Sequence, residues 1–352
     1  MTIIKVLVVD DSALIRSLLG AIIKSAKDMV LIGPAPDAYV ARDLVNLYAP
    51  DVITLDIRMP KVDGLTFLDK LMKAHPTPVV MISTLTEHGA GATIRALELG
   101  AIDYIAKPKL DVAYGIEEYR ELILEKIRTA ALAKVKSVKP VNPDLNNEDL
   151  VLHYCSTEKI IAVGASTGGT KAVKEFLMAL PANSPPVVIT QHMPSGFTTS
   201  FAKRLNELCK INVCEAQGSE RLLPGNAYIA PGNLHLSIER CGAYYRTLLL
   251  DTARVSGHKP SVDVMFTSLA KCAAKNTLAV IMTGMGRDGA KGMYLLHQNG
   301  AFTLAQDEAT CVVFGMPKEA INLGGVSEIL PLEQLASAVI KKLDTLKAES
   351  GL

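Results

Sequence analysis

Several features that would assign a protein to a class at first sight are missing from this sequence. It has no C-x-x-C pair, which argues against a zinc ribbon or a thioredoxin-like redox motif. The cysteines are scattered, and we expect them to be reduced thiols in the core: Cys155, Cys209, Cys214, Cys241, Cys272 and Cys311. No apolar run approaches the length of a membrane span, and the N-terminal MTIIKVLVVDDS reaches acidic residues before a signal-like segment forms. The sequence therefore predicts a cytoplasmic protein that is not inserted into a membrane.

A strong net charge is missing as well. The 37 Lys and Arg residues nearly balance the 36 Asp and Glu residues, and the formal net charge is +1. This balance gives no bulk attraction to nucleic acid or to anionic lipid, so we expect no nucleic-acid partner. The composition is globular, with 49% hydrophobic and 21% charged residues, and a length of 352 residues is enough for two domains.

Short apolar runs alternate with helical patterns over residues 1–133. The runs are IKVLVVD, MVLIG, DVITLD, PVVMIS and AIDYIAK, and patterns such as SALIRSLLGAIIKSA separate them. These five βα units predict a parallel sheet that helices cover on both faces. Residues 134–157 contain prolines and asparagines without an apolar period, and they predict a linker.

The alternation resumes over residues 158–352 with the runs KIIAV, VVIT and LAVIMT. We expect a doubly wound α/β domain with a mostly parallel sheet. The stretch NAYIAPGNLHLSIERCGAYYRTLLL instead alternates apolar and polar residues around Pro-Gly-Asn and Cys-Gly turns. It predicts an antiparallel hairpin that is added to the parallel sheet.

Acidic and basic side chains follow the predicted strands of the first domain. Because the carboxyl ends of parallel strands meet at one sheet edge, we expect five of these residues to gather there: Asp10, Asp11, Asp56, Ser83 and Lys107. Clustered carboxylates repel one another unless they share a cation, and Mg²⁺ suits such oxygen ligands. Asp56 could then attack a phosphoryl donor while Lys107 and Ser83 hold the transferred oxygens. The alternative, that the acids cap helices and form turns, explains single positions but not this co-location.

The motifs VVDDS, LDIRMPKVDG, MIST and IAKP resemble, in order and spacing, a response-regulator receiver domain. The resemblance implies a flavodoxin-like (βα)5 fold and a histidine kinase that donates the phosphoryl group to Asp56. It also implies a Mg²⁺ site formed by the carboxylates of Asp11 and Asp56, with Asp10 close by and the carbonyl of Arg58 as a further ligand. The residues it implies for the conformational switch are Ser83, Tyr104 and Lys107.

The segment IIAVGASTGG at residues 160–169 allows three interpretations. Its G-x-S-x-G spacing can place the Ser166 hydroxyl at the tip of a sharp strand-to-helix turn, as in a hydrolase nucleophile. The glycines equally suit a purely structural turn, or a loop whose N–H groups hold a phosphate. The segment by itself does not choose among them.

A serine becomes a useful nucleophile only when an oriented base lies within reach. His192 follows the run VVIT, and Asp288 lies in the loop GMGRDGA after LAVIMT, so both can converge with Ser166 at one sheet edge. His192 would take the Ser166 proton and Asp288 would hold the imidazole. The glycine-rich loop 284–289 could also present N–H groups to an oxyanion, and Thr167 is predicted as an oxyanion residue.

Other residues compete for these roles. His235 lies in the predicted hairpin and His258 in the polar SGHKP loop, so neither follows a parallel strand and both rank lower as bases. Asp263 and Asp307 compete for the third role, and Asp263 is expected to cap a helix that starts at Val264. A strand-end histidine is also often structural, and an aspartate in G-x-x-D-G is often a cap.

The chain order Ser, His, Asp differs from the Ser, Asp, His order of α/β-hydrolases. Over residues 159–340 the sequence resembles the catalytic domain of chemotaxis protein-glutamate methylesterases. The matching segments are IAVGASTGG, QHMPSGFTTSFAKRL, AYIAPGNLHL, KPSVDVMFTSLA, MTGMGRDGAKG and QDEATCVVFGMPKEA. The resemblance implies a triad of Ser166, His192 and Asp288, and an oxyanion contribution from the N–H of Met285.

Together these features predict a receiver domain at 1–133, a linker at 134–157 and a methylesterase domain at 158–352. The resemblance implies that methyl-accepting chemoreceptors are the substrate, that methanol is released from glutamyl methyl esters, and that receptor glutamines are deamidated. Mg²⁺ is expected in the receiver and no cofactor for ester hydrolysis. We expect a monomer that phosphorylation activates when the receiver ceases to cover the active site.

Two rival functions remain at the level of the sequence. One is a phosphorylation-gated binding module with a degenerate or nucleotide-binding second domain, for which Ser166 would be dispensable. The other is a DNA-binding response regulator, which the neutral charge and the lack of a compact basic helical module disfavour.

Overall fold

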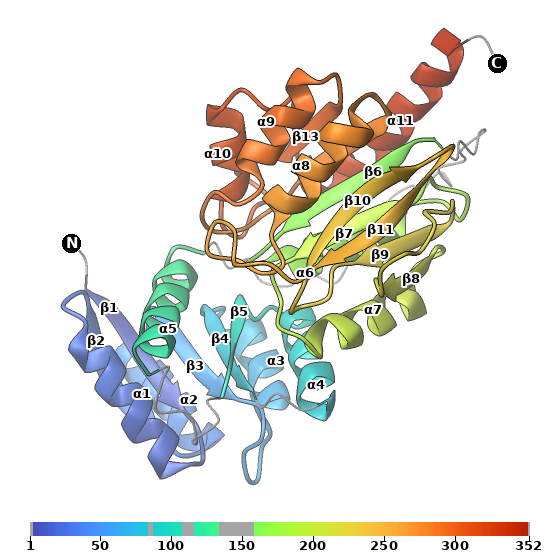
Figure 1. The fold of residues 1–352 in the computed structure, drawn as a ribbon. Coiled ribbons are helices and arrows are strands. Elements are labelled where there is room, and N and C mark those ends of the chain that lie inside the picture. Colours follow the sequence, from blue (N-terminus) through green and yellow to red (C-terminus); the bar gives the residue numbers. More distant parts are fainter. Residues whose placement is uncertain (1–2, 84–86, 108–115, 134–157, 351–352) are drawn as a thin grey trace. The chain divides into compact units, whose positions relative to one another are not determined.

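A computed structural model of the protein describes residues 3–83, 87–107, 116–133 and 158–350 (Figure 1). The chain divides into two compact units, Met1–Val141 and Asn142–Leu352. The whole of the predicted linker, 134–157, lies outside the described residues, so the predicted domain boundaries stay a prediction. Among the helices of the described ranges, none combines the length and the apolar character that crossing a membrane requires.

The first unit is a five-stranded parallel sheet in the order β2-β1-β3-β4-β5. Every residue of β3 and β4 is buried, because helices cover both faces of the sheet, and α1 contacts α5 while α3 contacts α4. The predicted (βα)5 fold is confirmed. Its elements are β1 Ile4–Val9, α1 Ala13–Ser25, β2 Met29–Ala35, α2 Ala38–Tyr48, β3 Val52–Asp56, α3 Gly64–Ala74, β4 Val79–Ser83, α4 Glu87–Glu98, β5 Asp103–Ala106 and α5 Ile116–Ala131.

Short polar side chains begin three helices of this unit. Ser12, Asp37 and Asp63 stand at the N-caps of α1, α2 and α3, and each accepts a hydrogen bond from a backbone N–H of the first turn. The capping explanation of the motifs DDS and VDG therefore holds for Ser12 and Asp63. It does not hold for Asp56, which is buried at a strand end, whereas the buried Asp10 accepts from the N–H of Ser12 at 2.9 Å and so also closes a turn before α1.

The second unit has a seven-stranded sheet in the order β14-β13-β12-β6-β7-β9-β8, and all neighbouring strands run parallel. Helix α6 contacts α7 and α11, while α8 and α9 contact each other. The elements are β6 Ile160–Ala165, α6 Gly169–Ala179, β7 Val187–Gln191, α7 Phe197–Leu208, β8 Asn212–Glu215, β9 Asn226–Ile229, β10 His235–Cys241, β11 Tyr244–Leu250, α8 Val262–Cys272, η1 Ala274–Asn276, β12 Thr277–Ile281, α9 Ala290–Gln298, β13 Phe302–Gln306, α10 Met316–Asn322, β14 Glu328–Leu330 and α11 Leu332–Ser350.

The predicted antiparallel hairpin is present as β10 and β11, which pair from His235↔Leu250 to Cys241↔Tyr244. It was expected to extend the parallel sheet, and this detail was wrong, because the hairpin forms a separate two-stranded sheet. Its apolar side chains explain the difference. Leu236, Ile238 and Tyr245 join the core around α8, so the hairpin buries one face against that helix and its residues do not pair with a sheet edge.

Strand β6 is the central strand of the seven-stranded sheet, with β12 on one side and β7 on the other. The chain thus winds outward from β6 in both directions, and the carboxyl end of such a switch point is where open α/β sheets bind ligands. Gly164 near the end of β6 lets α8 approach closely, because a Cβ there would overlap the side chain of Val262. The N-terminus of α8 is thereby held beside the end of β6.

Candidate active site

Three polar residues form a chain of hydrogen bonds at the carboxyl edge of the large sheet. The Nδ1 atom of His192 lies 3.1 Å from the Ser166 hydroxyl, and its Nε2 atom lies 2.7 Å from Oδ2 of Asp288. Asp288 is only 1% exposed, and the His192 side chain only 8%. If Nε2–H donates to Asp288, the Nδ1 lone pair faces the serine hydroxyl and can accept its proton.

Neighbouring strand ends bring these residues together. Ala165 and Gln191 are partners in the parallel ladder of β6 and β7, and the N–H of His192 donates to the Ala165 carbonyl at 3.1 Å. On the other side, the N–H of Ser166 donates to the carbonyl of Thr283, just past β12, at 3.0 Å. The predicted convergence thus follows from the order β12-β6-β7.

The turn after Ser166 is tight. Gly168 has a left-handed φ of 77°, and a Cβ there would lie 2.6 Å from Cβ of Val312, so a side chain at this position would be strained and crowded. The N–H of Gly169 donates to the Ser166 carbonyl at 2.7 Å, and the Gln191 amide donates to the same carbonyl at 2.9 Å. The Gly169 N–H therefore closes the turn and is not directed at an anion.

Asp288 accepts hydrogen bonds from several donors besides His192. The Ser261 hydroxyl lies 2.7 Å from Oδ1, and the first two N–H groups of α8, those of Val262 and Asp263, lie 2.7 and 3.1 Å from the carboxylate. Burial by itself raises the pKa of Asp288, but the bonds from His192, Ser261 and Val262 outweigh it, and the pKa lies below its usual value. A buried carboxylate at a helix N-terminus stays ionised in this way.

The expectation for Asp263 was wrong. Helix α8 begins at Val262, so Asp263 lies in its first turn and does not cap a helix starting at Val264. The reason is that Asp288 occupies the N-terminal donors of α8, while the Asp263 carboxylate accepts from the N–H of Gly292 at 2.8 Å. Burial, and then the charge of Asp288, raise the pKa of Asp263. Asp263 therefore holds α9 against α8.

The other residues that competed for these roles have different positions. Asp307 accepts from the N–H of Thr310 at 2.9 Å and so closes a local turn. His235 is fully buried, and its ring nitrogens contact the carbonyl of Ala253 and the N–H of Ser261, which makes it a structural residue. His258 differs from these residues, because its ring stacks on the ring of His192.

The two predicted oxyanion positions flank the serine in different ways. Gly284 runs directly beside Ser166, since a Cβ at Gly284 would lie 2.7 Å from the Ser166 Cβ. The N–H of Gly284 donates to the carbonyl of Val313 at 3.1 Å, and Met285 follows Gly284 in this loop. Thr167 is buried, and its carbonyl accepts from the Thr283 hydroxyl at 3.0 Å. The oxyanion roles themselves stay a prediction.

The first unit has a separate acidic pocket of about 330 Å³ at the carboxyl edge of its sheet. Carboxylate oxygens of Asp10, Asp11 and Asp56 lie within 4.8 Å of one another. The Lys107 ammonium lies 2.9 Å from both Asp10 and Asp56. Burial raises the pKa of Asp56, Lys107 opposes the shift, and the charge of Asp10 adds to it. The residues that line the pocket are Asp11, Asp56, Ile57, Arg58, Ser83, Gly89, Ala92 and Lys107.

This donor set fits a hard divalent cation. Three carboxylates face a single ammonium, so the group carries an excess of negative charge, and its ligands are oxygens, as Mg²⁺ prefers. Arg58, whose carbonyl was the predicted further ligand, lines the same pocket. The residues that the sequence predicted for the metal site and for phosphorylation therefore lie together in this pocket.

Of the three predicted switch residues, Ser83 and Tyr104 are buried, and the side chain of Lys107 is 17% exposed. Ser83 lines the acidic pocket, and its hydroxyl accepts from Thr93 at 2.8 Å. Tyr104 lies in β5, where the Lys126 ammonium stands 5.6 Å from the centre of its ring, and burial raises the pKa of the phenol well above its usual value. Their roles in switching stay a prediction.

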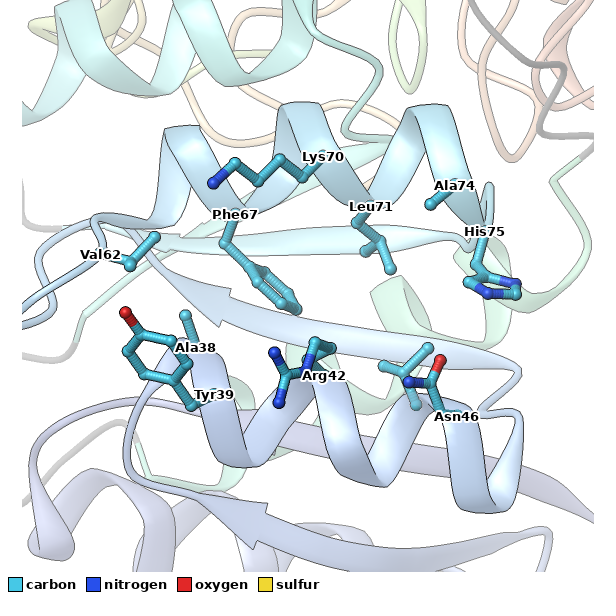
Figure 2. Close-up of a pocket in the computed structure, with 11 residues that line it drawn as sticks. Ala38, Tyr39, Arg42, Asn46, Val62, Phe67, Lys70, Leu71, Ala74 and His75 are labelled. Carbon is cyan, nitrogen blue, oxygen red and sulfur yellow. The ribbon is translucent and has the colours of Figure 1, made fainter.

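A second pocket of this unit, about 230 Å³ in volume, lies between α2 and α3 (Figure 2). Phe67 and Leu71 point into it from α3, and Arg42 and Lys70 are the charged residues of its lining. Among the described residues its lining has no carboxylate and a single histidine, His75, so it offers no acidic nucleophile and too few ligands for a metal ion. We therefore do not consider it a catalytic site.

Comparison with known families divides the chain in the same manner. Residues 161–339 match the family model described as CheB methylesterase, and residues 6–113 match the response regulator receiver domain. The two matches cover the triad and the acidic pocket, respectively.

Individual relatives are similar over nearly the whole chain. The protein-glutamate methylesterase/protein-glutamine glutaminase 2 of Pseudomonas aeruginosa is 57% identical over 342 residues, which is 96% of this chain and 97% of that protein. The protein-glutamate methylesterase/protein-glutamine glutaminase of Salmonella typhimurium is 53% identical and covers 98% of each chain. The crystal structure of the Thermotoga maritima CheB methylesterase catalytic domain is similar with a TM-score of 0.51 at 38% identity, over 52% of this chain and 97% of that one.

Proposed function

The chain belongs to the CheB methylesterase family and carries a response regulator receiver domain, and from this we propose that it hydrolyses glutamyl methyl esters of chemoreceptors under the control of phosphorylation. The protein is a hydrolase. The observation that carries the proposal is the series of contacts from Ser166 through His192 to Asp288 at the centre of the sheet.

In the first half of the reaction, the Ser166 oxygen attacks the γ-carbonyl carbon of a methylated glutamate, and Nδ1 of His192 takes the serine proton. The N–H groups of Met285 and Thr167 hold the oxyanion. Asp288 stays ionised and stabilises the imidazolium through Nε2. The C–O bond to methoxide then breaks, His192 returns the proton, and methanol leaves behind a glutamyl ester of Ser166.

In the second half, water replaces the alcohol. His192 takes a proton from the water as its oxygen attacks the acyl carbon, and the proton passes to the departing Ser166 oxygen. The product is the glutamate carboxylate, with release of one proton to solvent. A glutamine substrate follows the same route, with ammonia leaving in place of methanol, which agrees with the glutaminase activity named for the relatives. No cofactor enters these steps.

In the receiver, an Asp56 oxygen is the phosphoryl acceptor, and a chemotaxis histidine kinase is the donor. Asp10, Asp11 and Asp56, with the carbonyl of Arg58, would hold Mg²⁺, which supplies charge neutralisation for the phosphoryl group when it is bound. Lys107 and the Ser83 hydroxyl then bind phosphoryl oxygens. The new charge then changes the packing of Ser83 and Tyr104, and through them the rest of the receiver.

We also propose a substrate and a location for the protein. Its substrate would be the cytoplasmic methylated segments of methyl-accepting chemoreceptors, and we propose that it acts in the cytoplasm as a monomer. The near-zero net charge supports a protein substrate and no nucleic acid.

The test is methanol release from methylated receptor membranes, with and without a small phosphodonor. We expect methanol release by the wild type and no release by Ser166→Ala. In Asp56→Asn we expect that only the response to the phosphodonor is lost. A serine-directed fluorophosphonate should label the wild type and Ser337→Ala, a serine on α11, but not Ser166→Ala. If wild-type protein releases no methanol under either condition, the esterase proposal is wrong and a phosphorylation-gated binding module takes its place.

A further inference from the structure

His258 lies at the end of a tight turn between β11 and α8. The backbone of Val255 donates to His258 and receives a bond from it, at 3.0 and 2.9 Å. The two residues between them, Ser256 and Gly257, have left-handed φ values of 52° and 83°. This turn projects from an exposed loop, yet His258 itself is partly buried. The turn therefore places the imidazole of His258 partly inside the molecule, although the loop residues before it are exposed.

The turn is attached to the same helix that supports Asp288. The Ser256 hydroxyl donates to Oδ2 of Asp263 at 3.2 Å, and Oδ1 of Asp263 accepts from the N–H of Gly292. Further along the loop, Lys259 forms an ion pair with Asp251. The loop is thus fixed at both ends, and the position of His258 is fixed with it.

The rings of His258 and His192 are stacked, with their centres 3.8 Å apart and their planes inclined by 12°. We propose that His258 is a positioning residue for the general base, a role that rests on the proposed function of Ser166, His192 and Asp288. It contacts neither the substrate carbonyl nor the serine in this proposal. It acts through the face of His192.

Geometry gives the reason. The hydrogen bonds of His192 to Ser166 and Asp288 leave from two edges of the ring. Two such points fix a line, and the ring can still rock about that line and turn its Nδ1 lone pair away from the serine. A flat ring against one face stops the rocking and keeps water from that face. Misplacing a reacting group by about 1 Å can cost on the order of 100-fold in rate.

The stack also makes the charge of His258 matter. During acyl transfer His192 becomes a cation, and a neutral aromatic face stabilises a cation placed over it. A second cation at 3.8 Å would instead oppose proton transfer to His192. Among the described residues, titratable groups near the pair include Asp288 at the Nε2 edge, Asp263 on α8, whose N–H donates to Asp288, and Lys259, which follows His258 in the loop. On the loop, Arg254 donates to the carbonyl of Gly257. In this proposal a positive charge at residue 258 therefore opposes catalysis.

Three substitutions separate shape from charge. His258→Ala removes the stacked ring, His258→Phe retains a flat neutral ring, and His258→Arg places a flat permanent cation there. We expect the alanine variant to lose about 10- to 100-fold in kcat with KM within about twofold, because only the placement of the base changes. The phenylalanine variant should recover to within about threefold of the wild type. The arginine variant should move the acid limb of the pH–rate profile about one unit lower, since a nearby cation disfavours protonation of His192.

The measurements are methanol release and the second-order rate of fluorophosphonate labelling of full-length protein between pH 5 and 9, since labelling needs the same base but no receptor. Thermal unfolding of each variant shows that it is folded. Wild-type kcat in His258→Ala, equal loss in the Phe and Ala variants, or coincident acid limbs for the Arg and Phe variants would each overturn the inference. The Ser166→Ala variant distinguishes failure of this inference from failure of the proposed function, because activity in that variant would refute the proposed function itself.

Discussion

Both units bury an aspartate at the carboxyl edge of a parallel sheet, yet the two carboxylates have opposite surroundings. Asp56 accepts one backbone bond, from Ile57 at 2.8 Å, and pairs with Lys107 at 2.9 Å while it lines a pocket of about 330 Å³. Asp288 accepts from the N-terminus of α8, from Ser261 and from His192. Burial raises the pKa of Asp56, whereas the donors around Asp288 outweigh burial and lower its pKa.

This difference in surroundings suits Asp56 to react as a nucleophile and Asp288 to orient the imidazole of His192. An oxygen that faces a pocket beside other carboxylates can attack a phosphoryl group once a cation relieves the repulsion. A carboxylate whose lone pairs are occupied by fixed donors cannot attack anything, but it holds a base in place and stays charged. Residue type and strand-end position are the same in both units, and the hydrogen-bond donors decide the role.

The largest effect is expected from Asp288→Asn. An amide in this place directs N–H groups at the donors of α8 or at Nε2 of His192, so the imidazole loses its orientation and its counter-charge. Ester hydrolysis should fall by about 10⁴-fold, as when a triad aspartate is replaced elsewhere. The matched control is Asp307→Asn, a second strand-end aspartate that only closes a turn, and methanol release should stay within about threefold of the wild type. Equal losses in the two variants would contradict the comparison.

A second prediction concerns the cation between Asp10 and Asp56. Lys107→Met should abolish the response to a phosphodonor while leaving basal methanol release within about twofold. It should also lower the free energy of unfolding of the receiver by about 1–3 kcal/mol, because two buried carboxylates lose their partner.

Added Mg²⁺ should restore part of that stability in Lys107→Met, since a cation again faces the carboxylates. Denaturant unfolding with and without Mg²⁺ measures this. The control is Lys73→Met, whose pair with Asp69 is exposed and should matter by less than about 0.5 kcal/mol. A receiver that responds normally to the phosphodonor without Lys107 would show that Asp56 does not need this cation.

The smallest effect is expected from Ser261→Ala, which removes one donor from Asp288. We expect a loss of about tenfold in kcat and about 1 kcal/mol in stability at pH 7. A carboxyl whose pKa is lowered by folding contributes stability above its unfolded pKa of about 3.9 and loses it as pH falls through the folded value. The stability difference from wild type should therefore shrink below about pH 4.

Urea unfolding between pH 7 and pH 2 measures that difference. Ser268→Ala provides the control, because this serine lies on the same helix and donates to Met265, away from Asp288. Its stability difference should not depend on pH. A pH-independent difference for Ser261→Ala as well would mean that the hydroxyl supports the helix and not the carboxylate.

The fold could be predicted because it depends on local patterns. Continuous apolar runs separated by amphipathic helices predicted the two parallel sheets. Because His192 and Asp288 follow strands of one sheet, we also predicted that both lie close to Ser166. The hairpin was predicted as a unit but assigned to the wrong sheet, because the pairing of its edge depends on packing against α8. His258 ranked low because it does not follow a parallel strand, and a turn delivers it to the site instead.

The amino-acid sequence by itself thus determined the two sheets, the acidic pocket residues and the three residues of the proposed triad, since period and strand-end position are properties of the chain. Only the tertiary structure decided what surrounds each of them. Asp288 receives its donors from α8, and the ring of His258 packs on that of His192. These contacts, and the position of Asp263 in the first turn of α8, depend on which helix end packs against which strand end. Those contacts join residues far apart in the chain, and spacing along the sequence does not encode them.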